Sequence, residues 1–518
     1  MSFFTNNEFA KKALNFLGNR TLRRAAVVAS VMVYACGPAD TGDLTGVLGR
    51  RPWFHPQPPG MVYVKSGTFH TGQGGQDVFN SYLEPNKQMT ITAFWMDETE
   101  ITNNEYRQFV NYVVDSLARI MCDDDEYYFP EDEEGNRLIN PYRMVDWVKH
   151  KEELADMLYQ GDERFQGKHQ IDTRKLIYHF MWTDYEAAAK LDRDKYAPMD
   201  RSQFMRTEDV LVYPDTLCWV RDFTYSYNEP MAQVYFHHPK YDEYPVVGVS
   251  WHQAYAFCRW RTDRKTAYWE MNGYLPNTHD FRLPTEYEWE YAARGGRIGN
   301  KYPWGGPYAR NSKGCMLANF KPLRGNYGVD GGVYPVRVDS YFPNDFGLYN
   351  MAGNVNEWVL DVYRPMTTTD ANDFNTYRGN VFQTKVLDAD GNPVEKDSLG
   401  RIQYRTVTQE ESANRRNYRT GDVRNYADGD ENSVVDYKYG QSSLINEESR
   451  VFKGGSWKDR AYFLSPGTRR YLDQNLATDD LGFRCAMDRV GSPSGNIMKG
   501  GKGGNNFPGE KGKRKMKG

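Results

Sequence analysis

The sequence lacks a charge excess of either sign, since 65 Lys and Arg residues balance 69 Asp and Glu residues to a net charge of −4. This balance excludes a protein that holds nucleic acid by global positive charge. A phosphate-binding Gly-Lys-Ser/Thr loop is also missing, so the sequence shows no coupling to nucleotide hydrolysis. Aromatic residues are abundant, at 15%, and 46 Gly and 25 Pro accompany them. This mixture is typical of a loop-rich fold packed by large side chains.

A hydrophobic run long enough to span a bilayer is not seen near the N-terminus. The apolar run 25–35 is too short for a stable transmembrane helix, and basic residues precede it. It ends in Val33-Tyr34-Ala35-Cys36, which is typical of a bacterial lipobox. We therefore expect residues 1–35 to be a lipoprotein signal peptide and Cys36 to carry a covalent lipid. An ordinary secretory signal cleaved nearby and an uncleaved anchor remain the alternatives.

Cysteine is scarce, with six residues in 518. They are Cys36, Cys122, Cys218, Cys258, Cys315 and Cys485. If Cys36 is lipidated, five remain in an oxidising compartment, so at least one is unpaired or shared between chains. The stretch from Ser456 to residue 480 contains none.

Several segments have clear local signatures. Residues 61–72 alternate like a strand and then turn. Capping boxes predict helix starts after Thr102, Ser250 and Thr285, and the Gly pair 295–296 ends the third helix. The first helix has an apolar face, and so does the second. The residues on these faces are Tyr106, Phe109, Val110 and Val113 in the first, and Ala254, Phe257 and Cys258 in the second.

The domain organisation follows from changes in composition. Residues 36–60 are rich in Pro and Gly and are expected to be a tether. Residues 61–490 are expected to form one domain with two large insertions, at about 118–240 and about 364–450. The first insertion is rich in aromatic residues, such as Trp182 and Trp219, which favours an interface with a partner. The Gly- and Lys-rich tail 491–518 is expected to be disordered.

Ordered blocks of residues carry a family resemblance over roughly 60–115 and 244–490. They include RLPTEYEWEYAARGG, NDFGLYNMAGNVNEWVLD, FKGGSW and LGFRC. Together they resemble the formylglycine-generating enzyme, or sulfatase-modifying factor, fold. The resemblance implies an α+β, loop-rich fold related to C-type lectins.

The enzymes of that family use a pair of cysteines that binds copper and activates oxygen, because thiolate is a soft ligand that suits Cu(I). Both family cysteines lie between the blocks that match residues 454–457 and 481–485. This chain has no thiol there, so neither copper ligation nor thiol attack is possible in that interval. Its nine histidines show no H-x-x-x-H-x-E spacing, which an iron-dependent member would need. We therefore expect no catalytic residues and no enzyme activity.

The resemblance implies a disulfide between Cys258 and Cys485. This bridge would close more than two hundred residues and stabilise the fold by roughly 4–5 kcal/mol on chain-entropy grounds. Two buried free thiols remain the alternative. A further family cysteine is replaced here by Ala293, and its partner is missing as well.

The resemblance also implies structural Ca²⁺, which prefers several oxygen ligands. The first site would use the side chains of Asn350 and Glu357 and the carbonyls of Gly353 and Val355. A second site would use Asn319, the Phe320 carbonyl, Asp330 and the Gly332 carbonyl. Simple bracing of the loop by Asn354 and Glu357 is the alternative.

The combination of lipobox, tether and the blocks GMVYVKSGTFHTG, FWMDETEITNNEYRQFV and GNVNEWVLDVYRP resembles the GldK/PorK-type lipoproteins of gliding motility and type IX secretion in Bacteroidetes. That resemblance implies a protein on the periplasmic side of the outer membrane, held to the inner leaflet by its lipid. Its partners would be a GldN/PorN-type protein and further copies of itself in a ring. A lipid-anchored ligand- or partner-binding protein of lectin-like fold is the second hypothesis, and a formylglycine-generating-type oxidase is the third.

Overall fold

The computed structural model describes the central part of the chain in segments. The described residues are 57–73, 86–129, 139–140, 143–164, 167–183, 202–222, 230–271, 279–322, 328, 332–363, 383–388, 394–396, 400, 403–406 and 448–490. The predicted signal peptide, Cys36, most of the tether and the tail lie outside them. All of the described residues belong to one compact unit.

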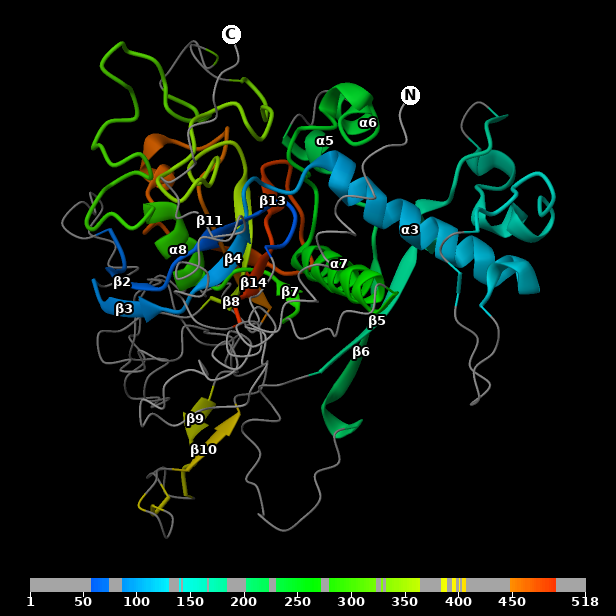
Figure 1. The fold of residues 1–518 in the computed structure, drawn as a ribbon, viewed down its shortest axis with the longest axis horizontal. Coiled ribbons are helices and arrows are strands. Elements are labelled where there is room, and N and C mark those ends of the chain that lie inside the picture. Colours follow the sequence, from blue (N-terminus) through cyan, green and yellow to red (C-terminus); the bar gives the residue numbers. More distant parts are fainter. Residues whose placement is uncertain are drawn as a thin grey trace, which may run out of the picture. The chain divides into compact units, whose positions relative to one another are not determined.

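Two four-stranded sheets organise this unit (Figure 1). The first is antiparallel throughout. Its strand order is β1 (Met61–Val64), β4 (Phe94–Asp97), β14 (Ala486–Asp488) and β7 (Phe281–Arg282). The second contains one parallel pair, β8 with β13. Its strand order is β12 (Arg470–Asp473), β11 (Ser449–Lys453), β8 (Asn356–Val362) and β13 (Leu481–Phe483).

Three two-stranded ladders accompany these sheets. They are β2 (Gly67–His70) with β3 (Gln88–Ile91), β5 (Ile177–Thr183) with β6 (Met205–Leu211), and β9 (Gln383–Lys385) with β10 (Tyr404–Thr406). The α-helices of the described ranges are α3 (Asn103–Cys122), α5 (Cys218–Asp222), α6 (Pro230–Val234), α7 (Trp251–Met271) and α8 (Glu286–Arg294). The fold is therefore α+β, as the sequence predicts.

Short 3₁₀ turns connect many of these elements. They are η2 (Asp125–Tyr127), η3 (Glu153–Met157), η4 (Gly161–Glu163), η6 (Thr173–Lys175), η7 (Ser202–Phe204), η8 (Pro239–Tyr241) and η10 (Ala461–Leu464).

The three predicted capping boxes are confirmed. Thr102 accepts from the Glu105 amide, Thr285 accepts from the Glu288 amide, and both glutamates bond back to the amide of the capping residue. Ser250 and Gln253 exchange the same pair of bonds before α7. Gly295 ends α8 in the left-handed conformation, with φ of 61°. Local sequence therefore sets these helix starts.

Helices α3 and α7 are neighbours in the fold (Figure 1). Their aromatic side chains meet in the largest core cluster. The Tyr106 and Phe257 rings stack with centroids 5.7 Å apart, and Phe109 packs against Trp260 at 5.3 Å. The predicted apolar faces of both helices are buried. Phe483 closes the cluster from β13, 5.4 Å from Phe257.

The strand predicted within residues 61–72 is divided into β1 and β2, which pair with different partners. The Tyr291 hydroxyl donates to the Lys65 carbonyl between them, at 3.0 Å. A Cβ at Gly67 would lie 2.4 Å from that hydroxyl, so a larger residue at this point would displace the Tyr291 side chain.

The first predicted insertion packs into the same core as the rest of the unit. Leu154, Phe180, Val210 and Phe236 belong to the cluster of α3 and α7. Trp219 is 2% exposed and stacks on Trp457, with centroids 6.2 Å apart. The Trp182 indole bonds to Glu208 within the insertion. The aromatic residues that suggested a partner interface are therefore used, in these two cases, for internal packing.

Candidate functional site

Residues 456–480 correspond to the segment that carries the reactive cysteines in the formylglycine-generating enzymes. In this chain, a network of hydrogen bonds joins the polar side chains of that segment. Asp459 accepts from the backbone amide and the hydroxyl of Ser456, both at 2.8 Å. The Arg470 guanidinium binds the same carboxylate at 2.7 and 2.8 Å. Burial alone would raise the pKa of Asp459, but Arg470 and Ser456 hold this pKa below its usual value. Asp459 therefore remains an ionised acceptor, with donors on both oxygens.

A second carboxylate, Asp480, joins this network. The Ser456 hydroxyl lies 2.9 Å from Asp480 Oδ2, and the Asn356 amide donates to it at 3.0 Å. Asn356 also bonds to Asp459 and Arg470. The interval 456–480 contains neither Cys nor His, so it offers no soft metal ligand and no imidazole beside Ser456. The hydrogen bonds of this network join β8, β12 and the loop before β13.

Beneath this network lies a cluster of buried ions between α8 and β11. The Lys453 ammonium, on a side chain 0% exposed, lies 3.5 Å from Glu286 and 3.3 Å from Glu290. Arg469 binds Glu286 through two bonds of 2.5 and 2.9 Å. Arg294 binds Glu290 across one helical turn. Three cations thus compensate two carboxylates, which fixes α8 against the second sheet.

The predicted calcium residue Glu357 is buried and already paired. Its carboxylate accepts two bonds from Arg484, both 2.6 Å long, and one from the Trp289 indole at 2.7 Å. The Trp289 indole and one Arg484 bond share Oε2, so Oε1 retains a lone pair for a further partner.

Sequence reasoning missed the role of Glu100, which lies in the turn before α3. Its carboxylate accepts from the side-chain amides of Asn350 and Asn354, at 2.9 and 3.1 Å. Burial raises the pKa of Glu100 to about 8, although Arg484 opposes this shift. No sequence signal marks Glu100, because its partners are about 250 residues away in the chain.

Left-handed backbone shapes the predicted calcium loop. Asn350, Gly353 and Asn354 have φ of 52°, 84° and 67°. A Cβ at Gly353 would lie 2.5 Å from the Asn319 carbonyl, so glycine permits this close approach. The Asn354 amide donates to that carbonyl at 2.8 Å. The loop thereby brings the first predicted calcium site against Asn319 of the second.

Two buried side-chain amide oxygens in this region are suited to coordinate a cation. Asn350 Oδ1 and Asn319 Oδ1 are both buried and find no hydrogen-bond partner among the described residues. Their nitrogens, in contrast, are satisfied: Asn350 donates to Glu100 and the Val338 carbonyl, and Asn319 donates to the Tyr334 carbonyl. Orphaned oxygens of this kind suit a hard cation such as Ca²⁺.

The structure describes all but one of the other predicted calcium ligands. Val355 and Phe320 are buried, and Gly332 lies beside Asn319, because a Cβ there would be 3.5 Å from the Asn319 amide nitrogen. Asp330 lies outside the described residues. The first site would therefore be held by Asn350, Glu357 and the carbonyls of Gly353 and Val355, and bound Ca²⁺ would cross-link the loop. Both calcium sites stay predictions.

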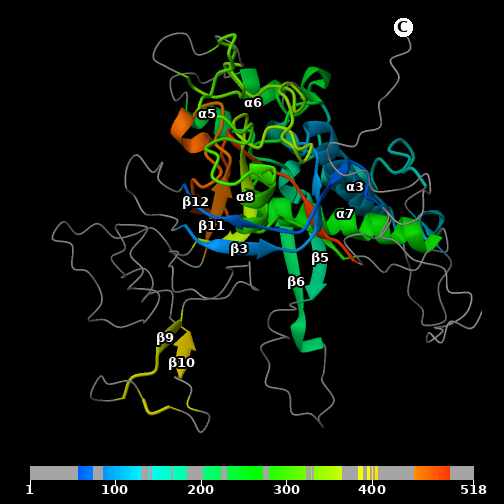
Figure 2. The ribbon, with the colours of Figure 1, turned by 60° about the vertical axis from the view of Figure 1, so that its left-hand side comes forward.

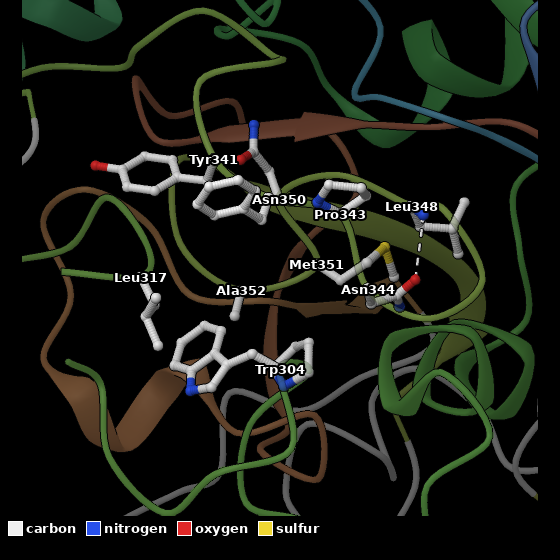
Figure 3. A pocket seen from close by; sticks show the side chains of 11 residues that line it. Trp304, Leu317, Tyr341, Pro343, Asn344, Leu348, Asn350, Met351 and Ala352 are labelled. Atoms are coloured by element: carbon white, nitrogen blue, oxygen red, sulfur yellow. Dashed lines mark hydrogen bonds between the residues drawn. The ribbon is translucent and has the colours of Figure 1, made fainter. Parts of the chain in front are cut away.

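A small cavity of about 50 Å³ adjoins Asn350. Figure 3 shows Asn350 beside Tyr341 on one side of it and Trp304 on the other. Asn344 braces the wall by accepting the Leu348 amide at 3.1 Å (Figure 3). A cavity of this size holds a few water molecules, which is compatible with a partly hydrated ion.

Cys258 and Cys485, predicted to form a disulfide, are neighbours in the core. Their sulfur atoms lie 3.4 Å apart, both side chains are buried, and both are thiols in this structure. Burial raises the pKa of the Cys485 thiol well above its usual value, and Cys258 adds to the shift. The structure thus brings the two residues together, and the bond between them stays a prediction.

The predicted lipidation residue, Cys36, lies outside the described residues. None of the helices in the described ranges combines the length and apolar character that crossing a bilayer requires.

Comparison with known proteins gives several matches. The sulfatase-modifying factor enzyme 1-like domain family matches residues 49–489. The inactive C-alpha-formylglycine-generating enzyme 2 of Bos taurus is 41% identical over 126 residues, which are 24% of this chain and 34% of that protein. The formylglycine-generating enzyme of Mus musculus is 39% identical over 304 residues, 58% of each chain. This chain thus spans between a third and three fifths of these two relatives' length.

Among solved structures, Treponema denticola variable protein 1 aligns with 83% of this chain and 94% of its own, at 16% identity and a TM-score of 0.35. The family match is the broader finding, because it covers most of the chain, including both predicted insertions. The chain therefore belongs to the sulfatase-modifying factor enzyme 1-like domain family.

Proposed function

We propose that this protein is a non-catalytic, lipid-anchored structural subunit of a periplasmic ring in the type IX secretion and gliding motility machinery. The observation that carries the non-catalytic part is the network in the interval 456–480. Ser456, Asp459 and Arg470 bind one another where the enzymes of the family carry reactive thiols. A site whose donors and acceptors satisfy each other, and which has no thiol, cannot bind copper as those enzymes do.

Relatives within the family support a non-catalytic member. The Bos taurus and Mus musculus relatives that are 41% and 40% identical are both named inactive, whereas others are named formylglycine-generating enzymes. The family therefore includes both kinds, and the residues of the interval decide between them. In this chain they favour a scaffold.

The location and the partners rest on the sequence of the N-terminus and on the resemblance to GldK/PorK-type lipoproteins. A lipid on Cys36 would hold the domain at the inner leaflet of the outer membrane, since each buried methylene contributes about 0.8 kcal/mol to anchoring. A GldN/PorN-type protein and further copies of this chain would then assemble into a ring. Structural Ca²⁺ at the loop 350–357 would stiffen the domain for that role.

Purification of the full-length lipidated chain from membranes tests the proposal. We expect a co-purifying partner on size-exclusion chromatography and ring-shaped particles in negative stain. A monomer without a partner would contradict the ring and favour the lectin-like binding protein. Incubation with a sulfatase-type Cys peptide and copper is the second arm, and turnover by the purified chain would overturn the non-catalytic assignment.

A further inference from the structure

The loops that follow α8 carry cations but no carboxylates. Residues 291–322 contain six Lys and Arg residues and neither Asp nor Glu. Lys301, Arg310 and Lys313 form no ion pair with any residue that the structure describes, and Arg310 and Lys313 are exposed. The whole chain is balanced in charge, so this positive stretch is a local feature, and an anionic surface complements it.

Large apolar side chains are exposed in the same region. Ile298, Tyr308 and Phe342 are 68%, 74% and 88% exposed. Single exposed apolar residues are common in soluble proteins, whereas a contiguous group marks a contact surface. The contacts between the loops therefore decide whether these three residues act together.

Trp304 connects Tyr308 to Phe342. Its indole donates to the Tyr308 carbonyl at 2.8 Å, which places Tyr308 beside the Trp304 ring. Trp304 and Phe342 line the same cavity of about 50 Å³, and Figure 3 shows Trp304 across this cavity from Tyr341. The buried Tyr302 ring stacks on Trp304 with centroids 4.9 Å apart, so the indole has a rigid base.

Ile298 joins this surface through its neighbour Arg297. The Arg297 guanidinium donates to Asp345 at 2.9 Å and to the Trp304 carbonyl at 3.5 Å. Asp345 lies three residues after Phe342, so the ion pair connects the loop after α8 to the loop that holds Phe342, and it neutralises the Asp345 carboxylate. In Figure 2 these loops form the light-green upper end of the unit, opposite to the β5–β6 ladder.

Two of the exposed cations flank the aromatic residues. Arg310 and Lys313 belong to one turn, which a bond of 3.0 Å from the Leu317 amide to the Ala309 carbonyl closes. Leu317 lines the same cavity as Trp304. The positive turn and the apolar side chains are therefore parts of one surface.

We propose that this surface docks on an anionic phospholipid bilayer. Trp304 and Tyr308 then lie at the level of the headgroups, Phe342 enters the apolar layer, and Arg310 and Lys313 meet the phosphates. An acidic protein would complement the cations alone, whereas a bilayer also receives apolar side chains that stand out from the domain. The inference does not depend on the proposed function, because it concerns the folded domain and not the lipid predicted at the N-terminus.

An environment-sensitive dye on Cys315 tests the inference in the full-length chain. Cys315 is exposed in the same turn as Lys313, and Cys122→Ser in every protein removes a half-buried thiol. The protein is mixed with excess vesicles of phosphatidylcholine, alone or with phosphatidylglycerol, that contain a lipid with a nitroxide quencher on its acyl chain. Peptide mapping verifies the position of the dye. We expect strong quenching with phosphatidylglycerol and little without it, because the cations need anionic headgroups.

Two variants locate the contact. Phe342→Glu should lower the ratio of docked to undocked protein about tenfold, because a carboxylate then faces the anionic headgroups. Val148→Glu is the matched control, since Val148 is 87% exposed in the first insertion and the variant adds the same charge. Replacement of both Arg310 and Lys313 by Gln should lower the ratio about thirtyfold, because each cation near an anionic bilayer contributes a factor of about five.

Three results would overturn the inference. They are unquenched dye with the phosphatidylglycerol vesicles, equal quenching with phosphatidylcholine alone, and an equal loss in Phe342→Glu and Val148→Glu. A dye response to soluble polyglutamate but not to vesicles would assign the surface to an acidic protein and would also contradict the inference. Flotation of the same samples measures how much protein the vesicles bind, so a failed N-terminal anchor is distinguished from failed docking of the loops.

Discussion

At the scale of single residues, buried ion pairs hold distant blocks of the sequence together in space. Arg484 and Glu357 are both fully buried and bind through two bonds of 2.6 Å, although 127 residues separate them in the chain. Such a pair adds little net stability over apolar residues of the same shape, but removal of one partner leaves an uncompensated charge in the core. The ion pair therefore favours the one packing in which Glu357 of β8 lies beside Arg484, which follows β13.

Replacement of Arg484 should strongly destabilise the folded protein. We expect Arg484→Met to lower the free energy of unfolding by about 3–5 kcal/mol, because it leaves the buried Glu357 carboxylate without its charged partner. Arg297→Met is the matched control, since Arg297 and its partner Asp345 are about half exposed and such pairs contribute less than about 1 kcal/mol. Urea denaturation of both variants gives the comparison, and equal losses would contradict this account.

The two orphaned asparagine oxygens lead to a prediction about metal. We expect a calcium chelator to lower the melting temperature, because a ligand at 100 times its Kd stabilises by about 2.7 kcal/mol. Asn350→Ala should abolish most of this response. Asn344→Ala is the matched control, because Asn344 lines the same cavity but has both side-chain atoms bonded within the protein.

Elemental analysis of the purified protein accompanies the melting experiment. Absence of metal together with a melting temperature that is unchanged by chelator would contradict both calcium sites. If the chelator still lowers the melting temperature of Asn350→Ala, the metal binds at a place other than the loop 350–357.

At the scale of elements, sequence signals predicted the helices better than the strands. Capping residues and apolar periodicity are local, so Thr102, Ser250 and Thr285 marked the helix starts correctly. The division of β1 from β2 depends on Tyr291, more than 220 residues away, and no local pattern contains that information. The absence of thiols in the interval 456–480 was plain from the sequence, but the bonds that Ser456 makes to Asp459, three residues on, and to Asp480, 24 residues on, were not predicted.

The predicted disulfide would join α7 to the turn between β13 and β14. Peptide mapping without reduction should recover Cys258 linked to Cys485, whose sulfur atoms already lie 3.4 Å apart. Replacement of both residues by Ala should cost roughly 4–5 kcal/mol, because the bond closes a long loop. Cys315 is exposed and should be alkylated without reduction, as an internal control. Recovery of both Cys258 and Cys485 as free thiols would refute the bond.

At the scale of the whole molecule, the family and the α+β class followed from ordered sequence blocks, but the packing of the first insertion did not. Its aromatic residues suggested a surface for a partner, whereas Trp219 is buried against Trp457 and Tyr235. Aromatic composition cannot distinguish burial within a chain from burial between chains, because both remove the same apolar area from water.

The predicted lipid on Cys36 would set where the whole molecule resides. We expect the unmodified protein in the outer-membrane fraction and Cys36→Ser in the soluble periplasmic fraction, because the variant loses the acyl chains that bury methylene groups in the bilayer. Cell fractionation with an antibody against the folded domain measures both. A Cys36→Ser protein that stays membrane-bound would refute lipidation as the anchor.

The contact between Trp219 and Trp457 should also give the protein an intrinsic spectroscopic signal. The two indoles are nearly parallel, with 22° between their planes, and their centroids are 6.2 Å apart. Excited states of chromophores this close couple, so the pair should contribute a split band to the near-ultraviolet circular dichroism spectrum. Because one indole comes from the first insertion and the other from the block after β11, loss of that band would report their separation without any added dye.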